Sequence, residues 1–382
     1  MGSNEVASLV NPLHPTLVER LDPAFTEIYI RYQGIVYLET ASIYHVQSLT
    51  SEPTASRLRA DQVPYEEYNR DRKKYDFPTA KVAGPAPDVA STKIYQVPVS
   101  NPSGEIDIQV YVPTPEAVLN AGLEREGLLP ALVNFHGGGF VIGGLDSDES
   151  LCRKFCQRVG CIIVNVAYRL APEYPHPISA TDSWQALKWI FQNADALKID
   201  PSRVGVGGLS AGACIAAVLA LQARDDPSLP RLAVQLLIVP VIDARFVPKE
   251  GSCDPTKTPY KSYVDFEFAP MLPLNRLVWF YNLWLGTDES RDEKAKDFRA
   301  SPIVADSHSN LAPAIIRCAE IDPLVSEGVA YHEKLTAAGT PSKIKIYKGQ
   351  GHPFGHWDGS NPTSKEFVTD CVNELKAAFA KN

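Results

Sequence analysis

A serine flanked by glycines, in the segment Gly208-Leu209-Ser210-Ala211-Gly212, is the feature of this sequence that says most about chemistry. The apolar stretch VGVG comes directly before it and the small-residue stretch ACIAAVLA directly after it, so we expect a strand to end and a helix to begin at the serine. A turn this sharp leaves no space for neighbouring side chains, which explains the two glycines. The pattern predicts that Ser210 is a nucleophile held at a strand-to-helix turn.

Two other interpretations of this turn must be weighed. In a glycine-rich turn, Ser210 could simply pack or cap the helix. A dinucleotide-binding turn also joins a strand to a helix, but it requires GxGxxG, whereas residues 205–212 read GVGGLSAG. The next apolar stretch, IVPVID, offers no clear ribose-binding acid at the required distance.

A run of three glycines, His136-Gly137-Gly138-Gly139-Phe140, stands at the end of another apolar stretch. Successive glycines allow backbone N–H groups to turn outward into a shared anion site. Taken alone, such a run is only a flexible loop. Together with the serine turn it matches the oxyanion loop of lipases and esterases.

A nucleophilic serine needs a base and an orienting acid, which on this type of fold follow in the order serine, acid, histidine. Asp322 follows the apolar stretch AIIRCAEI, and His352 follows KIKIY after a short loop. Both therefore lie at the ends of predicted strands, as Ser210 does. Asp322 could also cap a helix ahead of Pro323, and His356 is a rival for the role of base.

The elements that must position these residues alternate between strand and helix. An antiparallel hairpin at 93–114 opens the sheet, and a strand near 130–138 precedes the glycine run. We expect later strands at 161–168, 203–210, 234–242, 314–322 and 342–349, with helices at 148–159, 179–194 and 211–224. Strands separated by helices predict βαβ units, and therefore a mostly parallel, doubly wound sheet of the α/β class.

The chain divides into two parts in this interpretation. Residues 1–90 contain no convincing strand and read as a helical segment, with stretches at 23–49 and 63–77. Residues 91–382 form the α/β domain, interrupted by an aromatic-rich insertion at about 245–300. Insertions at the carboxyl ends of strands are where such sheets bind ligands.

The motifs together resemble one family. HGGGF, YRLAPEYPHP, GLSAG, DPL from Asp322 and HPF from His352 are similar to the hormone-sensitive-lipase-like branch of the α/β-hydrolases, over residues 90–380. The helical segment 1–90 resembles the N-terminal cap of that family. The resemblance implies Ser210 as nucleophile, His352 as base, Asp322 as its orienting acid, and an oxyanion hole from the N–H groups of Gly138, Gly139 and Ala211. His352 is preferred to His356 because it precedes x-Phe, and His136 and residues 168–173 are expected to support the glycine loop.

The sequence departs from the family pattern at three places. Leu209 stands where the family often has Asp, and Ala213-Cys214 where it has Gly-Asn. Ser326 replaces an acidic residue, and Pro353 replaces the glycine of HGF, which removes one backbone N–H from the loop of the base. None of these changes removes a reacting group.

The composition excludes several classes of function. The 382 residues carry 37 basic and 45 acidic side chains, and this net charge of −8 has the wrong sign for binding nucleic acid or an anionic membrane. No apolar run is long enough to span a membrane and the start does not resemble a secretory signal, so we expect a cytoplasmic protein. Seven scattered cysteines without a CxxC pair indicate reduced thiols, not disulfides or a zinc site.

These observations predict a serine carboxylic-ester hydrolase that uses no metal and no organic cofactor. Two alternatives stay open: a lyase, dehydratase or cyclase that uses the same oxyanion hole and base without an acyl-enzyme, and a small-molecule receptor on the same fold. A catalytic histidine at 352 argues against the receptor.

Aromatic residues concentrate in two segments, and they bear on the substrate. They are Phe25, Tyr29, Tyr32, Tyr37 and Tyr44 in the first segment and Tyr260, Tyr263, Phe266, Phe268, Trp279, Phe280, Tyr281 and Trp284 in the second. We expect both segments to meet above the carboxyl ends of the strands and to roof an apolar pocket. Such a pocket suits a neutral small-molecule ester with a short acyl group and a bulky alcohol part. The alternative is that the rings only attach the cap to the body.

Overall fold

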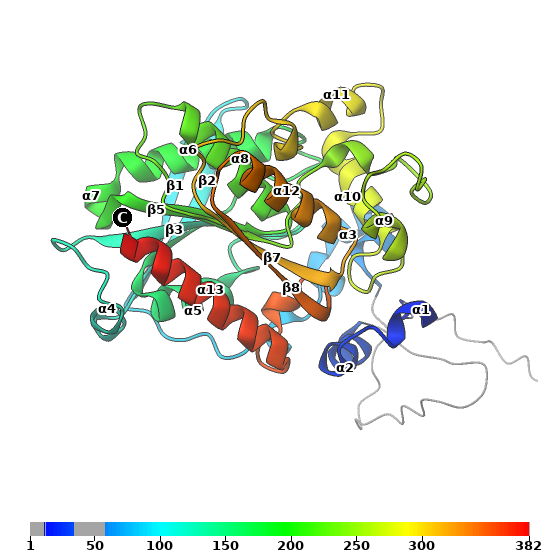
Figure 1. Ribbon diagram of the computed structural model, residues 1–382, viewed down its shortest axis with the longest axis horizontal. Helices are drawn as coiled ribbons and strands as arrows, with labels where there is room; N and C mark the ends of the chain where they lie inside the picture. Colours follow the sequence, from blue (N-terminus) through cyan, green and yellow to red (C-terminus); the bar gives the residue numbers. More distant parts are fainter. Residues whose placement is uncertain (1–10, 12, 34–57, 382) are drawn as a thin grey trace, which may run out of the picture.

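An eight-stranded sheet forms the centre of the protein, whose computed structural model describes residues 11, 13–33 and 58–381 (Figure 1). The strands lie in the order β1-β2-β4-β3-β5-β6-β7-β8. They are β1 Ser91–Val99, β2 Gly104–Val112, β3 Leu129–Phe135, β4 Ile162–Val166, β5 Ile199–Leu209, β6 Gln235–Ile238, β7 Ala314–Ile321 and β8 Ser342–Gly351. β1 and β2 pair antiparallel, as do β2 and β4, and all the later pairings are parallel. The predicted hairpin and the mostly parallel sheet are confirmed.

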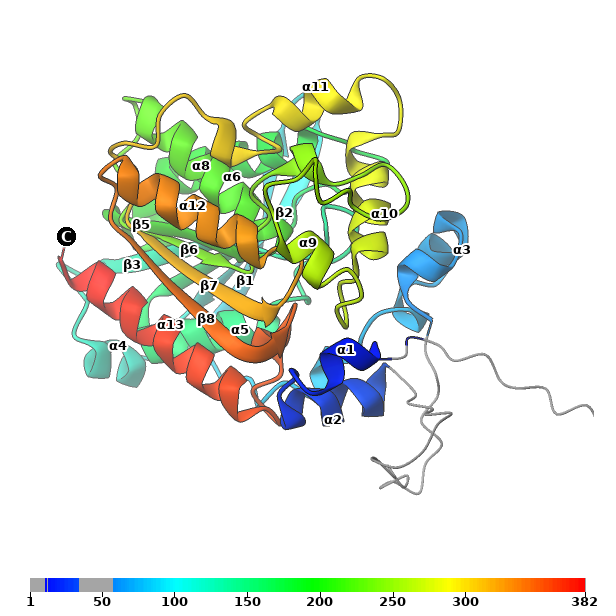
Figure 2. The same ribbon diagram turned by 45° about the vertical axis from the view of Figure 1, so that its right-hand side comes forward.

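Helices cover both faces of this sheet, as a doubly wound fold requires (Figures 1 and 2). On one side lie α6 Ile178–Gln192, α8 Ala211–Asp225 and α12 Val325–Ala337, whose apolar residues share one core cluster. On the other side lie α5 Glu149–Phe155 and α13 Pro362–Lys381, which share a second cluster. Smaller helices, α4 Pro115–Ala121 and α7 Ala194–Leu197, lie between the strands in sequence. The predicted α/β-hydrolase class is the observed one.

Burial on both faces explains why the central strands could be predicted from the sequence. Every residue of β3 and β4 is buried, because helices cover both sides, and the strands are accordingly continuous apolar runs. β1 lies at the sheet edge and has mostly exposed residues, with burial confined to alternate positions near its end. Its alternating pattern is therefore that of a half-buried strand.

The N-terminal segment is only partly helical. It contains α1 Pro15–Val18, α2 Pro23–Tyr32 and α3 Tyr65–Arg70. The helix predicted over 23–49 is observed as far as Tyr32, and positions 34–57 lie outside the described residues. The helix predicted over 63–77 is too long: α3 ends at Arg70 because the backbone of Asp71 leaves the helical region, with φ −148° and ψ 72°, and a 3₁₀ turn follows at Arg72–Lys74.

The insertion is helical and touches the N-terminal segment. It contains α9 Ser262–Asp265, α10 Leu274–Leu285 and α11 Arg291–Lys296, and Figure 2 shows α9 and α10 on the side of the sheet where α1 to α3 also lie. His14 stacks on Phe268 with ring centroids 4.5 Å apart. The Asp61 carboxylate lies 3.3 Å from Arg276 of α10. The insertion therefore contacts the N-terminal segment at His14 and Asp61, outside the aromatic stretch that begins at Phe25; the predicted meeting of the two aromatic-rich segments stays a prediction.

No helix in the described part of the chain is both long and apolar enough to cross a membrane.

Candidate active site

Ser210 occupies the turn between β5 and α8, and its backbone is strained. Its φ of 56° and ψ of −114° lie in a region that non-glycine residues rarely adopt, at a cost of about 1–3 kcal/mol. The Ser210 N–H donates to the carbonyl of Ile238 at 2.8 Å, which ties the turn to the end of β6. The strand–turn–helix arrangement predicted from the sequence is thus present.

The glycines on either side of this turn are required by the neighbouring strand β3. A Cβ atom at Gly208 would lie 2.4 Å from the carbonyl oxygen of Phe135, and one at Gly212 would lie 1.8 Å from the same oxygen. Real Cβ atoms do not approach carbonyl oxygens this closely, so only glycine fits at either position. The close packing of α8 on β3 brings the helix start, with its free N–H groups, to the serine.

His352 and Asp322 form a buried hydrogen-bonded pair at the same edge of the sheet. Asp322 follows β7 and His352 follows β8, and His352 Nδ1 lies 2.7 Å from Asp322 Oδ2. The other oxygen, Oδ1, accepts the N–H of Leu324 at 2.9 Å. α12 begins only at Val325, so Asp322 is not its N-cap; the carboxylate braces the turn ahead of the helix instead. This leaves one oxygen free to orient the imidazole.

His356, the rival for the role of base, belongs to a different carboxylate. Its Nε2 lies 3.3 Å from Asp148 Oδ1, and Asp148 Oδ2 accepts a hydrogen bond from Asn134 at 3.2 Å. Burial lowers the pKa of His356, which favours the neutral imidazole. The structure therefore brings Asp322 to His352 and not to His356.

The hydroxyl of Ser210 is not hydrogen-bonded to this pair. Within the described ranges, Ser210 Oγ makes no hydrogen bond, to His352 or to any other residue, although 5% of the residue is exposed. Catalytic hydrogen bonds in ligand-free proteins are often long and tighten only when substrate is bound. The three residues share one sheet edge, since β5, β7 and β8 all end there.

The glycine loop presents unused N–H groups beside the serine turn. Gly138 and Gly139 have φ values of 112° and 60°, which glycine adopts without strain. The N–H groups of Gly138, Gly139 and Ala211 donate to no other residue among those described, whereas the Gly138 carbonyl accepts two bonds at 3.0 Å from Val141 and Ile142. This arrangement suits an oxyanion, and Ala211 adds the positive end of the fifteen-residue helix α8.

His136 and Tyr168 hold this loop in shape, as the sequence suggested. Their rings stack with centroids 4.3 Å apart, the Tyr168 hydroxyl donates to the His136 carbonyl at 2.7 Å, and His136 Nδ1 lies 2.7 Å from the Gly137 carbonyl. Burial lowers the pKa of His136. The Ala171 N–H donates to the Phe140 carbonyl at 2.9 Å. The segment after Tyr168 therefore clamps the far end of the loop as well.

Aromatic side chains of α10 close over the glycine loop. A Cβ at Gly139 would lie 2.3 Å from the Phe280 ring, so the ring rests directly on the loop backbone. Trp284 stacks on Phe140 with centroids 3.7 Å apart, and Trp279 meets Tyr68 edge-on at 6.2 Å.

Rings of the N-terminal segment pack on the loop of the base. Phe25 of α2 stacks on Trp357 at 4.6 Å, and a Cβ at Gly351, next to His352, would lie 2.7 Å from the Phe25 ring. Tyr37 and Tyr44 lie outside the described residues. Phe25 therefore attaches the N-terminal segment to the body, as the alternative interpretation of these rings expects.

Glu327 is a buried acid that the sequence analysis did not single out. Its Oε2 accepts the N–H groups of Ile242 and Asp243, each at 2.7 Å, and the Tyr263 hydroxyl donates to its Oε1. Burial raises the pKa of Glu327 to about 8, against the opposing effect of these three donors. Glu327 therefore fastens the loop after β6 and the α9 helix to α12, five residues after Asp322. Exposed helices also often carry a glutamate in the first turn, so the position of Glu327 in the sequence does not indicate that it is buried.

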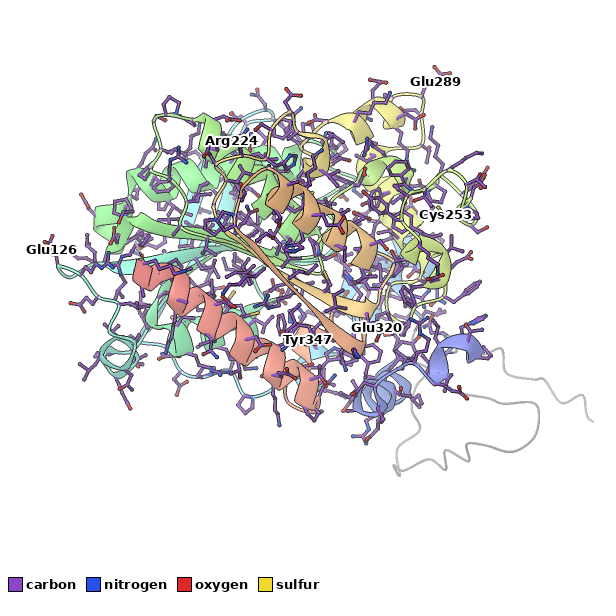
Figure 3. The ribbon with its side chains drawn as sticks, in the orientation of Figure 1. Glu126, Arg224, Cys253, Glu289, Glu320 and Tyr347 are labelled. Atoms are coloured by element: carbon purple, nitrogen blue, oxygen red, sulfur yellow. The ribbon has the colours of Figure 1, made fainter. Side chains whose placement is uncertain are left out.

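In the described ranges, no group of three or more His, Cys, Asp and Glu side chains is arranged to hold a metal ion. The seven cysteines carry free thiols; Cys253, in the insertion, is half-buried (Figure 3), and the other six are buried.

Comparisons with known proteins agree with the fold and the motifs. A family model described as the alpha/beta hydrolase fold matches residues 132–356. The AB hydrolase superfamily protein C1039.03 of Schizosaccharomyces pombe is 33% identical over 99% of this chain and 100% of its own length. The ethyl acetate hydrolase of Pseudomonas putida is 34% identical over 74% of this chain and 81% of its own. The structure of EstE1, a carboxylesterase cloned from a metagenomic library, superposes with a TM-score of 0.70 at 31% identity, covering 84% of this chain and 99% of that chain.

The chain belongs to the hormone-sensitive-lipase-like carboxylesterase family of the α/β-hydrolase superfamily. It is a carboxylesterase-type hydrolase.

Proposed function

We propose that the protein hydrolyses carboxylic esters through Ser210, His352 and Asp322. His352 takes the proton of the Ser210 hydroxyl as Oγ attacks the ester carbonyl, and then gives that proton to the departing alcohol. A water molecule, deprotonated by the same imidazole, cleaves the acyl-enzyme and restores the serine. No step requires a metal or an organic cofactor.

The observation that carries this proposal is the 2.7 Å hydrogen bond between His352 and Asp322 at the sheet edge where Ser210 sits in its strained turn. With Nδ1–H donated to the buried carboxylate, Nε2 is the nitrogen left to accept a proton. Asp322 also stabilises the imidazolium that forms. A receptor on this fold would have no need of such a pair.

The oxyanion of the tetrahedral intermediate is assigned to the N–H groups of Gly138, Gly139 and Ala211. Their lack of acceptors among the described residues supports this role, since a donor already satisfied gains nothing from a new negative charge. Removing one such donor in other hydrolases costs about 3 kcal/mol in transition-state stabilisation.

For the substrate we propose a neutral small-molecule ester with a short acyl group and a bulky alcohol part. The Phe280 ring rests on the glycine loop and Trp284 on Phe140, so apolar rings crowd the side of the oxyanion loop. Flat apolar walls favour a bulky uncharged group. One relative is named for the hydrolysis of ethyl acetate, an ester with a two-carbon acyl group.

Mass spectrometry of the intact protein after treatment with an activated phosphonate tests the nucleophile. We expect one phosphonyl adduct on the wild type and none on Ser210→Ala, and an unlabelled wild type would overturn the assignment.

A series of p-nitrophenyl esters tests the acyl preference: kcat/KM should be highest for short acyl chains, and a maximum at about ten carbons or more would refute this preference. Labelling of Ser210 without hydrolysis of any ester would favour the lyase or cyclase alternative.

A further inference from the structure

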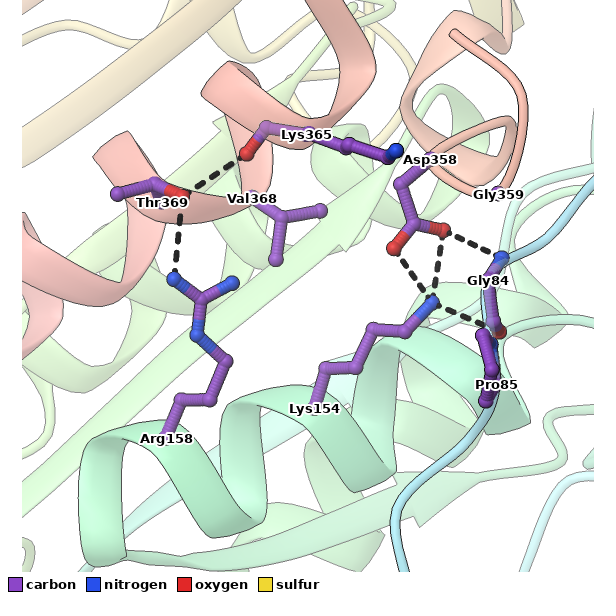
Figure 4. Close-up of a pocket in the computed structure, with 9 residues that line it drawn as sticks. All are labelled: Gly84, Pro85, Lys154, Arg158, Asp358, Gly359, Lys365, Val368 and Thr369. Atoms are coloured by element: carbon purple, nitrogen blue, oxygen red, sulfur yellow. Dashed lines mark hydrogen bonds and ion pairs between the residues drawn. The ribbon is translucent and has the colours of Figure 1, made fainter. Parts of the chain in front are cut away.

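A hollow of about 370 Å³ lies between α5 and α13 (Figure 4), and its lining includes neither Ser210 nor the His352–Asp322 pair. One wall is the first part of α13, with Lys365, Val368 and Thr369. The opposite wall is α5 and the π-helical segment Cys156–Gly160 that continues it, with Lys154 and Arg158. Residues 84–85 and 358–359 close one end. Its volume is within the range of small-molecule sites, which begins at about 300 Å³.

Three cations and one carboxylate line this hollow. The carboxylate, Asp358, is already satisfied: it accepts the Gly84 N–H at 3.0 Å and lies 2.7 Å from the buried ammonium of Lys154. Lys154 also donates to the Gly84 carbonyl at 3.1 Å. The Lys154–Asp358 pair is therefore neutral.

The other two cationic side chains, Arg158 and Lys365, have no carboxylate as an ion-pair partner among the described residues. Neither Arg158 nor Lys365 forms an ion pair with any described residue, although acidic side chains outnumber basic ones in the chain. Arg158 donates to the Thr369 hydroxyl at 3.0 Å, which holds its guanidinium beside α13. The two side chains come from facing walls (Figure 4). Two unneutralised positive charges across one hollow are the complement of a dianion.

We propose that this hollow binds a phosphoryl group, either free phosphate or the phosphate of a small organic phosphate ester. Arg158 binds the phosphoryl oxygens with its planar donors, and Lys365 contributes a second charge from the other wall. The Thr369 hydroxyl accepts from Arg158 and donates its own proton to the Lys365 carbonyl at 2.9 Å, so it positions the guanidinium and adds no donor to the ligand. The hollow is larger than one phosphate needs, and Pro85 and Val368 offer apolar surface to a carbon skeleton.

Isothermal titration of the full-length protein with inorganic phosphate and with glycerol 3-phosphate, at fixed ionic strength set with chloride, tests this site. We expect saturable binding with a stoichiometry of one. Tighter binding of glycerol 3-phosphate identifies an organic phosphate as the ligand, and equal affinities identify free phosphate. Absence of saturable heat with both probes overturns the proposal.

Variants then locate the binding. Arg158→Gln and Lys365→Gln should each weaken binding at least tenfold, and Arg158→Lys should weaken it less than Arg158→Gln. Lys376→Gln is the matched control, because it removes the same charge from α13 about 16 Å along the helix from Lys365. Equal loss in the control would show general charge attraction and would overturn the site. Melting curves without phosphate verify that each variant is folded, and a rise in Tm with phosphate that persists in Arg158→Gln would also refute it.

Discussion

Two histidines four residues apart in one loop face two different aspartates, and the pairs differ in geometry. His352 makes a hydrogen bond of 2.7 Å to Asp322, at the sheet edge that also carries Ser210. His356 lies 3.3 Å from Asp148, without hydrogen-bond geometry, and Asp148 is shared with Asn134. The first aspartate is placed by the end of β7, whereas the second stands just before α5.

The difference shows what would separate the proposed reacting pair from a structural pair in this fold. Both imidazoles and both carboxylates are nearly buried, so burial does not distinguish them. The two pairs differ instead in their position relative to the strand ends, because parallel strands bring the loops after β5, β7 and β8 to one edge of the sheet. The His356–Asp148 contact instead helps to anchor the far end of the base loop to the body, alongside the Lys154–Asp358 pair.

The largest expected effect comes from removing the base. His352→Ala should lower kcat for a p-nitrophenyl ester by about 10⁶, as loss of the histidine does in a triad that acts as a unit. Stopped and continuous assays of ester hydrolysis measure kcat, and an unchanged melting curve verifies that the variant is folded. If His356→Ala is inactive while His352→Ala retains its activity, the assignment of the two histidines is reversed.

The next largest effect concerns the acid. Asp322→Asn should lower kcat by about 10⁴ with little change in KM, because the amide favours the wrong imidazole tautomer and does not stabilise the imidazolium. Asp148→Asn is the matched comparison and should leave kcat within about tenfold of the wild type. Equal losses of kcat in the two variants would contradict the separation of roles.

A smaller effect, on stability, is expected from the second pair. His356→Ala removes a buried imidazole from beside Asp148 and should lower the free energy of unfolding by about 2 kcal/mol. Urea denaturation followed by circular dichroism measures it. A variant as stable as the wild type would show that this contact does not anchor the loop.

The last effect, which grows with pH, sharpens the comparison with a third buried carboxylate. Burial raises the pKa of Glu327 from 4.5 to about 8, so the folded protein holds this proton more tightly than the unfolded chain. Stability from this group is therefore complete below pH 4.5 and is lost as the pH rises toward 8. Glu327→Gln should gain stability relative to the wild type over that window, by at most about 1.4 kcal/mol per pH unit.

Urea midpoints at pH 5, 6, 7 and 8 test this slope. Glu333→Gln, on the exposed side of the same helix, should show no such dependence. A stability difference between wild type and Glu327→Gln that stays constant with pH would rule out the elevated pKa.

Much of the fold could be predicted from the sequence because the local hydrophobic pattern of each element matches its burial in the structure. β3 to β7 are covered on both faces and read as apolar runs, and the strand–turn–helix around Ser210 follows from the glycine-flanked serine together with the apolar stretch before it and the small-residue stretch after it. The acid and base could be ordered along the chain, but their meeting at 2.7 Å is a property of the sheet topology.

Other features depend on contacts between distant segments, and the sequence could not reveal them. The partner of His356 is 208 positions away, Glu327 looks like any acid in a first helical turn, and Gly351 gave no sign that Phe25 would lie against it. α3 is shorter than predicted because its amphipathic pattern continues past Asp71, where the backbone leaves the helix. The roles of the triad and the oxyanion hole stay predictions until the variants are measured.

The contact between the serine turn and the Phe135 carbonyl has a consequence for mutational scanning. Gly208 and Gly212 are required by the distance to that oxygen, whether or not Ser210 reacts with anything. In a saturation library selected only for folded protein, these two positions should accept glycine alone, while Ser210 should tolerate alanine. Selection for ester cleavage should add Ser210 to the intolerant set and leave the two glycines as they were. Selection for folding alone should therefore detect Gly208 and Gly212, whereas only selection for ester cleavage should detect Ser210.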